Sequence, residues 1–129
     1  MKTRTLAALV MFIAFAGCTT HGTWARYEMC FGLSRDAGQT VLSQEQWQTF
    51  VNEEIIRQFP DGFSLLEADG HWLGKTGPLS EPAKILMVVA PDNRDTLLKF
   101  QTLAKAYIMK FQQEAVLEIK SQVTVIFHH

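Results

Sequence analysis

Residues Ala83 to Ala90 read AKILMVVA, and this stretch decides which fold the rest of the chain can build. Only Lys84 interrupts its apolar side chains. A short apolar run of this length predicts a strand that is covered on most of both faces. We therefore expect this strand to lie inside a sheet, with its neighbours supplied by the segments on either side.

The segment before this run predicts its hairpin partner. Residues 63–73 are strand-like, and residues 74–81 are rich in Gly and Pro, which predicts a loop. We therefore expect a hairpin whose two strands are joined by a long connection. The apolar positions of the first of these strands are Phe63, Leu65, Leu66, Ala68 and Trp72.

Two amphipathic helices flank the hairpin in sequence. Ser43 is a favourable N-cap for the first, Gln46 completes a capping box, and Pro60 ends the helix before an Asp61-Gly62 turn. The second helix follows residues 91–93, with Asp92 or Asn93 as its cap. Their apolar faces are Trp47, Phe50, Val51, Ile55 and Phe59 in the first helix, and Leu97, Phe100, Leu103, Ala104, Tyr107, Ile108 and Phe111 in the second.

Alternating residues predict the two remaining strands, at 24–33 and 116–127, with a loop at 34–40. The element order is therefore β-α-β-β-α-β. With right-handed crossovers this order predicts a ferredoxin-like α+β fold, an antiparallel sheet with both helices on one face. In the first strand, one face carries Ala25, Tyr27, Met29, Phe31 and Leu33, and the other carries Arg26, Glu28, Cys30 and Gly32.

The second face of such a sheet has no covering element within the chain. The first strand places polar groups there, but the apolar central strand places Leu86 and Val88, or their neighbours, on the same surface. A half-apolar open face is commonly buried by a second copy of the same chain. We therefore expect a homodimer through the open face as one partner of this domain.

The first eighteen residues, MKTRTLAALVMFIAFAGC, predict a lipoprotein signal peptide. Lys2 and Arg4 precede an apolar run, residues 6–16, that is too short to span a bilayer, which needs roughly 20 residues. Phe15-Ala16-Gly17-Cys18 resembles the bacterial lipobox, with Phe15 where Leu is usual. That resemblance implies cleavage before Cys18 and attachment of fatty acyl chains, such as palmitate, to its side chain.

Acylated Cys18 would anchor the domain to membrane lipid, because two or three acyl chains bind far more strongly than one. We expect residues 1–17 to be the signal peptide, 18–23 a lipidated cysteine and short tether, and 24–129 a single domain. A residue other than Asp after the cysteine, here Thr19, implies outer-membrane sorting. The expected location is the cell envelope, lipid-anchored in the outer membrane and facing the periplasm.

The other cysteine, Cys30, has no intramolecular disulfide partner if Cys18 is acylated. It is then either buried or paired between chains.

The net charge of the domain argues against nucleic acid as a partner. Residues 1–17 carry two basic and no acidic side chains, so their removal leaves ten basic groups (12 − 2) against thirteen acidic ones, a formal charge of −3. A mildly acidic domain lacks the basic surface that binding to nucleic acid requires. We expect no nucleic-acid partner.

With these elements placed, the sequence resembles the bacterial family catalogued as domain of unknown function 3574. The resemblance runs from about residue 27 to residue 127, and its most specific part is Phe59-Pro60-Asp61-Gly62 followed by Gly70 and Trp72. It supports the order of elements and the envelope address, and it implies no activity, substrate or cofactor. The other matching residues are Phe31-Gly32-Leu33-Ser34, Trp47, Phe50, Glu81, Tyr107, Phe111 and Gln113-Glu114-Ala115-Val116.

The densest polar cluster gives the candidate binding residues. Alternation places Glu67, Asp69 and His71 on one strand face, where they could form a general-base or metal site, although a solvated strand face has the same spacing. Glu81 could face a pocket and pair with Arg57, or make only a turn contact. The candidate binding residues are Arg57, Glu67, Asp69, His71, Trp72 and Glu81. The common catalytic and cofactor motifs are absent, so we assign no catalytic residue, metal ligand or cofactor.

Three functions remain open. The first is a non-catalytic envelope module that binds a small ligand or an envelope protein, and the missing catalytic motifs favour it. The second is a small dimeric α+β barrel-type enzyme with a pocket between two open sheet faces, which rests on fold analogy alone. The third is a purely structural envelope component. The sequence leaves open whether the domain is an enzyme and favours a non-catalytic role.

Overall fold

The computed structural model describes residues 22–35 and 40–129, so the predicted signal peptide, Cys18 and most of the predicted tether lie outside the described residues. Its main body is an antiparallel sheet of four strands in the order β4-β5-β1-β6. These strands are β1 (Trp24–Gly32), β4 (Ser64–Gly74), β5 (Gly77–Pro91) and β6 (Leu117–Val123).

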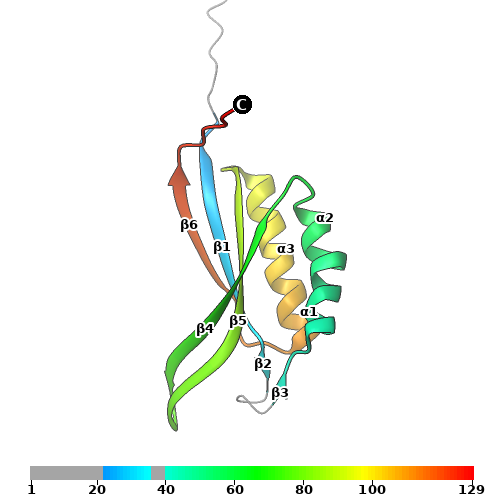
Figure 1. The fold of residues 1–129 in the computed structure, drawn as a ribbon, viewed down its shortest axis with the longest axis vertical. Coiled ribbons are helices and arrows are strands. Elements are labelled where there is room, and N and C mark those ends of the chain that lie inside the picture. The colour runs from blue at the N-terminus through cyan, green and yellow to red at the C-terminus, as the bar shows by residue number, and fades with distance from the viewer. Residues whose placement is uncertain (1–21, 36–39) are drawn as a thin grey trace, which may run out of the picture.

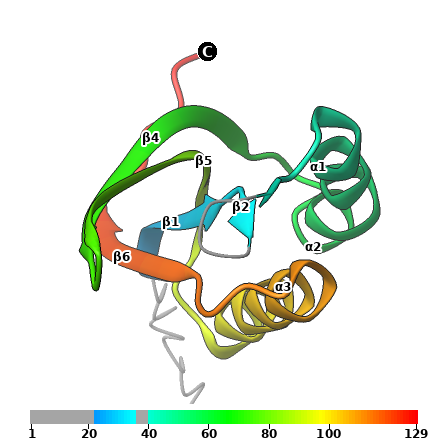
Figure 2. The ribbon, with the colours of Figure 1, turned by 90° about the horizontal axis from the view of Figure 1, so that it is seen from below.

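Two helices cover one face of the sheet (Figure 1, Figure 2). The first is continuous but consists of three segments, because its middle turn is a wider π-helix in which the amide of Ile56 donates to the carbonyl of Val51. The fold class α+β, with an antiparallel sheet and two helices, is therefore confirmed. The helical segments are α1 (Gln44–Phe50), η2 (Val51–Ile55) and α2 (Ile56–Gln58), followed later in the chain by α3 (Arg94–Phe111).

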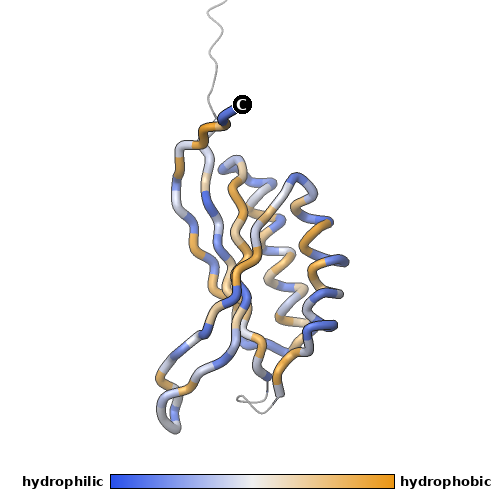
Figure 3. The backbone as a smooth tube through the Cα atoms, in the orientation of Figure 1, coloured by the Kyte–Doolittle hydropathy of each residue, from blue (hydrophilic) through white to orange (hydrophobic). Residues whose placement is uncertain are grey.

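The apolar run at 83–90 lies inside the sheet, as predicted. From Ala83 to Pro91, β5 pairs with β1, while its other edge pairs with β4. Figure 3 shows this half of β5 as a continuous apolar stretch. Leu86 and Val88 are buried beneath the helices, so their neighbours Ile85, Met87 and Val89 face the open side.

Aromatic rings fill the core between sheet and helices. Phe31 of β1 contacts Trp47 and Phe50 of the first helix and Tyr107 of α3, with a centroid distance of 4.6 Å to Tyr107. Such ring pairs contribute about 0.5–1.5 kcal/mol each beyond the area that they bury. The apolar positions predicted for the first helix are all buried: Trp47, Phe50, Val51, Ile55 and Phe59.

The predicted core face of the second helix is wrong at Leu97, whose side chain is 42% exposed. Thr96 is buried in its place. The buried side chains of α3 form a narrow stripe that faces the sheet and runs from Thr96 through Phe100 to Phe111. Leu97 lies to one side of this stripe. Both predicted caps are present: Ser43 and Gln46 form the capping box, and Asn93 rather than Asp92 accepts from the amide of Thr96.

The long loop predicted at 74–81 is wrong. Strands β4 and β5 pair continuously as far as Gly74 and Gly77, so that only two residues form the turn. The carbonyl of Pro82 accepts from the amide of Leu33, so Pro82 directs its backbone polar groups away from β4. Pro78, four residues earlier, has the same orientation because alternate strand residues share it. Pro78 and Pro82 have no backbone N–H, but an N–H at either position would point away from β4, so the β4–β5 ladder loses no hydrogen bond.

Because β4 and β5 pair continuously, their paired ends form an arm that extends beyond the rest of the sheet. Strand β1 ends at Gly32, opposite Ala83, whereas β4 and β5 continue beyond it as a two-stranded ribbon (Figure 1). We call residues 69–82 the β4–β5 arm. Its tip lies at the opposite end of the molecule from the start of β1 and the C-terminus (Figure 1).

Two smaller boundaries also differ from the prediction. The expected loop at 34–40 contains a short ladder, in which β2 (Ser34–Arg35) pairs with β3 (Thr40–Val41). The last strand ends at Val123 rather than Phe127, because its partner β1 begins at Trp24 and offers nothing further to pair with.

At the end opposite the arm, Asp92 joins three elements. Its carboxylate accepts from the Tyr27 hydroxyl at 3.2 Å and from the Lys120 ammonium at 2.6 Å, and its amide donates to the carbonyl of Thr23. The Lys120 contact lowers the pKa of Asp92 and raises the pKa of Lys120. The start of β1, the end of β5 and strand β6 are thus connected through one carboxylate.

We expect Asp92→Asn to destabilise the fold in a pH-dependent way. Because the pKa of Asp92 is lowered in the fold, its stabilisation is present above the unfolded pKa of about 3.9 and is lost as pH falls through the folded value. The midpoint of urea unfolding should therefore be lower for the variant at pH 7, and the difference should shrink as the pH is lowered below about 3.9. A difference that stays constant as the pH falls would contradict this role for the ionised carboxylate.

Candidate functional site

The predicted polar cluster on β4 is only partly assembled. The register places Glu67, Asp69 and His71 on one face, opposite Lys84, Pro82 and Ser80, as their alternation indicated. The Lys84 ammonium donates to the Glu67 carboxylate, and this hydrogen bond lowers the pKa of Glu67. Within residues 22–35 and 40–129, no three His, Cys, Asp or Glu side chains gather closely enough to hold a metal ion.

The remaining predicted site residues lie apart. His71 and Trp72 are exposed on the arm, with Trp72 on the opposite face from His71, and Arg57 is exposed on α2. The structure gives Glu81 a partner other than Arg57, since its carboxylate accepts from the amide of Ser34 at 2.9 Å. The six candidates therefore do not share one site.

Two of them line a shallow pocket at the base of the arm. It has a volume of about 260 Å³ and includes Glu67 and Asp69. Its one cation, Lys84, is already paired with Glu67, so the pocket offers an anionic ligand no unpaired positive charge among its described lining residues. The full lining is Leu33, Glu67, Ala68, Asp69, Pro82, Ala83 and Lys84.

A second group of side chains meets where β1 ends. The Tyr107 hydroxyl donates to the carbonyl of Gly32 at 2.7 Å, and the Gln113 amide donates to the carbonyl of Ser34 at 2.9 Å. Together with the bond from Ser34 to Glu81, these contacts hold the chain as it leaves the sheet. We call Gly32, Ser34, Glu81, Tyr107 and Gln113 the β1-end cluster.

The chemistry of the β1-end cluster is that of a fixed scaffold. Burial, and secondarily the Glu81 carboxylate, raises the pKa of Tyr107, so its hydroxyl stays protonated and remains a donor. The lack of a side chain at Gly32 leaves room for the Glu81 carboxylate, since a Cβ there would lie 2.5 Å from it and the carboxylate would have to move away from Ser34. The cluster therefore positions the segment that follows it, which begins with Ser34 and Arg35.

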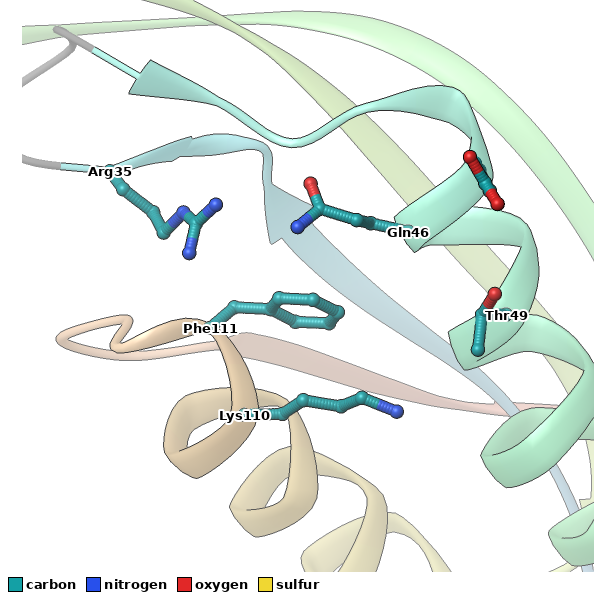
Figure 4. A pocket seen from close by; sticks show the side chains of 6 residues that line it. Arg35, Gln46, Thr49, Lys110 and Phe111 are labelled. Carbon is teal, nitrogen blue, oxygen red and sulfur yellow. The ribbon is translucent and has the colours of Figure 1, made fainter.

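Arg35 enters a pocket of about 310 Å³ between α1 and the end of α3. Figure 4 shows its guanidinium pointing toward the Gln46 amide, with the Phe111 ring beneath both and Lys110 beyond the ring. The Nε atom of Arg35 is buried and has no hydrogen-bond partner. We call this the Arg35 pocket; its lining is Arg35, Glu45, Gln46, Thr49, Lys110 and Phe111.

The uncovered face of the sheet is the third candidate surface. Four of its apolar side chains are 42–60% exposed, namely Leu66, Val89, Leu117 and Ile119. Near its centre, Arg26 and Glu28 of β1 form an ion pair. Cys30 lies beside them, half-buried, and burial followed by the Glu28 charge raises the pKa of its thiol. We call this surface the open face.

Sequence reasoning singled out neither Arg35 nor the hydrogen bond of Gln113. Arg35 falls in a segment that looked like a loop, and periodicity says nothing about where a loop side chain points. Gln113 was identified only as a residue that matches the family pattern, and the C-cap of α3 is Gln112, whose backbone is left-handed with φ of 53°. The family pattern, which includes Glu81, Tyr107 and Gln113 among its matching residues, was the only signal for the cluster.

The family model described as "Protein of unknown function (DUF3574)" matches residues 26–127. The chain belongs to this family. No curated protein matches this DUF3574 member. Within the described residues no helix has the length and apolar character needed to cross a membrane.

Two solved structures share the fold of this DUF3574 domain. A phage SAM lyase in complex with S-methyl-5′-thioadenosine superposes with a TM-score of 0.60 at 16% identity, over 78% of this chain and 81% of that one. A phage SAM lyase in the apo state gives a TM-score of 0.59 at 16% identity, over 85% and 96%. At this identity the likeness concerns the fold alone.

We expect Glu81→Ala to destabilise the domain by about 1–2 kcal/mol, because the amide of Ser34 loses its acceptor. Gly32→Ala should also be destabilising, since its methyl group displaces the Glu81 carboxylate. In the double variant the two costs should be less than additive, because the carboxylate that the added methyl group would displace is gone. Urea unfolding of the four proteins measures this coupling, and strict additivity would contradict the proposed contact.

Proposed function

We propose that this DUF3574 protein is a cell-envelope lipoprotein whose domain is a non-catalytic binding module that acts as a homodimer. Acylated Cys18 would anchor it to the outer membrane, with the domain facing the periplasm. The observation that carries the proposal is the broad apolar open face, which no element of the described chain covers.

The position of the anchor supports this orientation. Cys18 precedes the start of β1 at Trp24 by only a few residues, and fully extended residues span at most about 3.6 Å each. The domain would therefore sit close to the lipid surface. The tip of the β4–β5 arm lies at the far end of the domain from the start of β1 (Figure 1) and would point away from the membrane.

The strand order supports the ferredoxin-like description of the fold. In β4-β5-β1-β6, strand β5 lies between β1 and β4, which the first helix connects. A split β-α-β arrangement, which the sequence predicted, would have this order. Such a sheet carries both helices on one face and leaves the other available for a partner.

The size of the open face suits a second copy. About twenty residues of the four strands point to this side, and a standard protein interface involves roughly 20–30 residues from each partner. Cross-strand pairing brings apolar groups together where Leu66 lies beside Ile85, whereas Glu28 lies between Met87 and Ile119. A surface of this kind is costly to leave in water.

Charge and the arm favour a copy of this chain over an unrelated partner. Arg26 and Glu28 lie side by side, so a two-fold axis between them would bring each Arg26 near the other copy's Glu28. Trp72 and Leu79 form a cross-strand pair on the open-face side of the arm. A two-stranded hairpin is marginally stable alone, and a second copy would support it.

We expect Cys18→Ser to abolish membrane attachment of the mature protein. The wild-type chain should fractionate with membranes, incorporate an alkyne-tagged fatty acid and show the added mass of acyl chains at residue 18. The variant should lack the label. Recovery of an unacylated wild-type protein in the soluble fraction, with a free thiol at residue 18, would contradict the anchor.

We expect Ile119→Glu to convert the homodimer into a monomer, because it places a charge on the open face without touching the core. The matched control is Met109→Glu, which adds the same charge to α3 on the opposite side of the molecule, at a side chain that is 70% exposed. Sedimentation equilibrium of the full chain in density-matched detergent, at several protein-to-micelle ratios, gives the oligomeric state.

In that experiment the wild type and Met109→Glu should be dimers while Ile119→Glu is a folded monomer by its thermal unfolding curve. A monomeric wild type, or a dimer that survives Ile119→Glu, would overturn the proposed interface. Capture of a different envelope protein by the open face of a monomeric wild type would also overturn the homodimer.

One observation favours the barrel-type enzyme as a second candidate. Arg26, Glu28 and Cys30 are polar groups near the centre of a mainly apolar face, where two stacked sheets would enclose them. The phage SAM lyase with a similar fold holds S-methyl-5′-thioadenosine. A thermal shift with that compound that disappears in Glu28→Gln would favour the enzyme, whereas its absence would favour the binding module or a purely structural role.

A further inference from the structure

Arg35 carries a charge that the described structure does not neutralise. Its Nε atom is buried without an acceptor, and the side chain makes none of the ion pairs found among the described residues. Burying a charged donor without a partner is costly. The β1-end cluster nevertheless holds Ser34, the preceding residue, by both its amide and its carbonyl.

The pocket in front of Arg35 offers further donors. The Oε1 atom of Gln46 is occupied as the acceptor for the amide of Ser43, so the remaining group of this amide, its NH₂, is the donor that Figure 4 shows on the Arg35 side. Thr49 adds a hydroxyl on the neighbouring turn of α1. A planar guanidinium beside an amide donor matches the two oxygens of a carboxylate.

The other lining residues restrict the ligand. Lys110 is paired with Glu53 at 3.1 Å, so Arg35 is the only cation without an ion pair among the described lining residues, and the Glu45 carboxylate in the same lining disfavours a ligand with more than one negative charge. A single charge favours a monoanion over a phosphate dianion. The Phe111 ring lies at the base of the pocket (Figure 4), but it is packed into the core and only 4% exposed, so it offers a ligand little surface.

We propose that the Arg35 pocket binds a small monocarboxylic acid. The carboxylate accepts from Arg35 and Gln46. The pocket lies between the helices on the covered side of the sheet, so this site does not depend on the homodimer or on its interface.

The test uses the full-length chain in detergent with three probes: benzoate, its neutral isostere benzamide, and inorganic phosphate. Calorimetric titration measures the Kd of each for the wild type, for Arg35→Gln and for the matched control Arg57→Gln, which removes an exposed arginine on α2 outside the pocket lining. Thermal unfolding verifies that each variant is folded.

We expect benzoate to bind the wild type and Arg57→Gln equally, and Arg35→Gln to weaken it by about tenfold or more, since charged hydrogen bonds are lost. Benzamide and phosphate should bind much more weakly than benzoate. The proposal is overturned if the wild type fails to bind benzoate, if Arg35→Gln binds it unchanged, or if phosphate or benzamide binds as tightly. Ile119→Glu should retain benzoate binding, which separates this site from the dimer.

Discussion

The fold depends on the packing of alternate side chains of β1 against the two helices. Tyr27, Met29 and Phe31 are fully buried. The ring of Tyr27 contacts Phe100 on α3, and the ring of Phe31 contacts Tyr107 on α3 and Trp47 on α1. Since strand side chains alternate, burying this set forces Arg26, Glu28 and Cys30 onto the opposite face. The same packing thus produces both the core and the open face.

The elements predicted from sequence were those specified by local rules. The capping box at Ser43, the stop at Pro60 and the apolar run of β5 each have a short-range cause, and each is present. The loop at 74–81 was wrong because proline was interpreted as a strand breaker, which holds only where a neighbouring strand needs the missing N–H. Whether β1 extends far enough to need the N–H groups of residues 82 and 78 depends on the tertiary structure and cannot be predicted from local composition.

The candidate site was less predictable than the fold. Glu67, Asp69 and His71 share a face as alternation requires, yet Glu67 is paired with Lys84 and His71 lies on an exposed arm. The Arg35 pocket joins residues 35, 46 and 111, and no spacing rule relates side chains so far apart in the chain. Its formation follows from tertiary contacts made by Glu81, Tyr107 and Gln113, whose partners are backbone atoms and therefore leave no complementary residue to recognise.

The β4–β5 arm contacts the segment that carries Arg35. Glu81 belongs to the free-standing ribbon, and its carboxylate binds the amide of the residue that immediately precedes Arg35. A second hydrogen bond joins the ribbon to the chain just beyond the end of β1, where the amide of Leu33 donates to the carbonyl of Pro82. A displacement of the ribbon at Glu81 would therefore act directly on the segment that carries the guanidinium of Arg35.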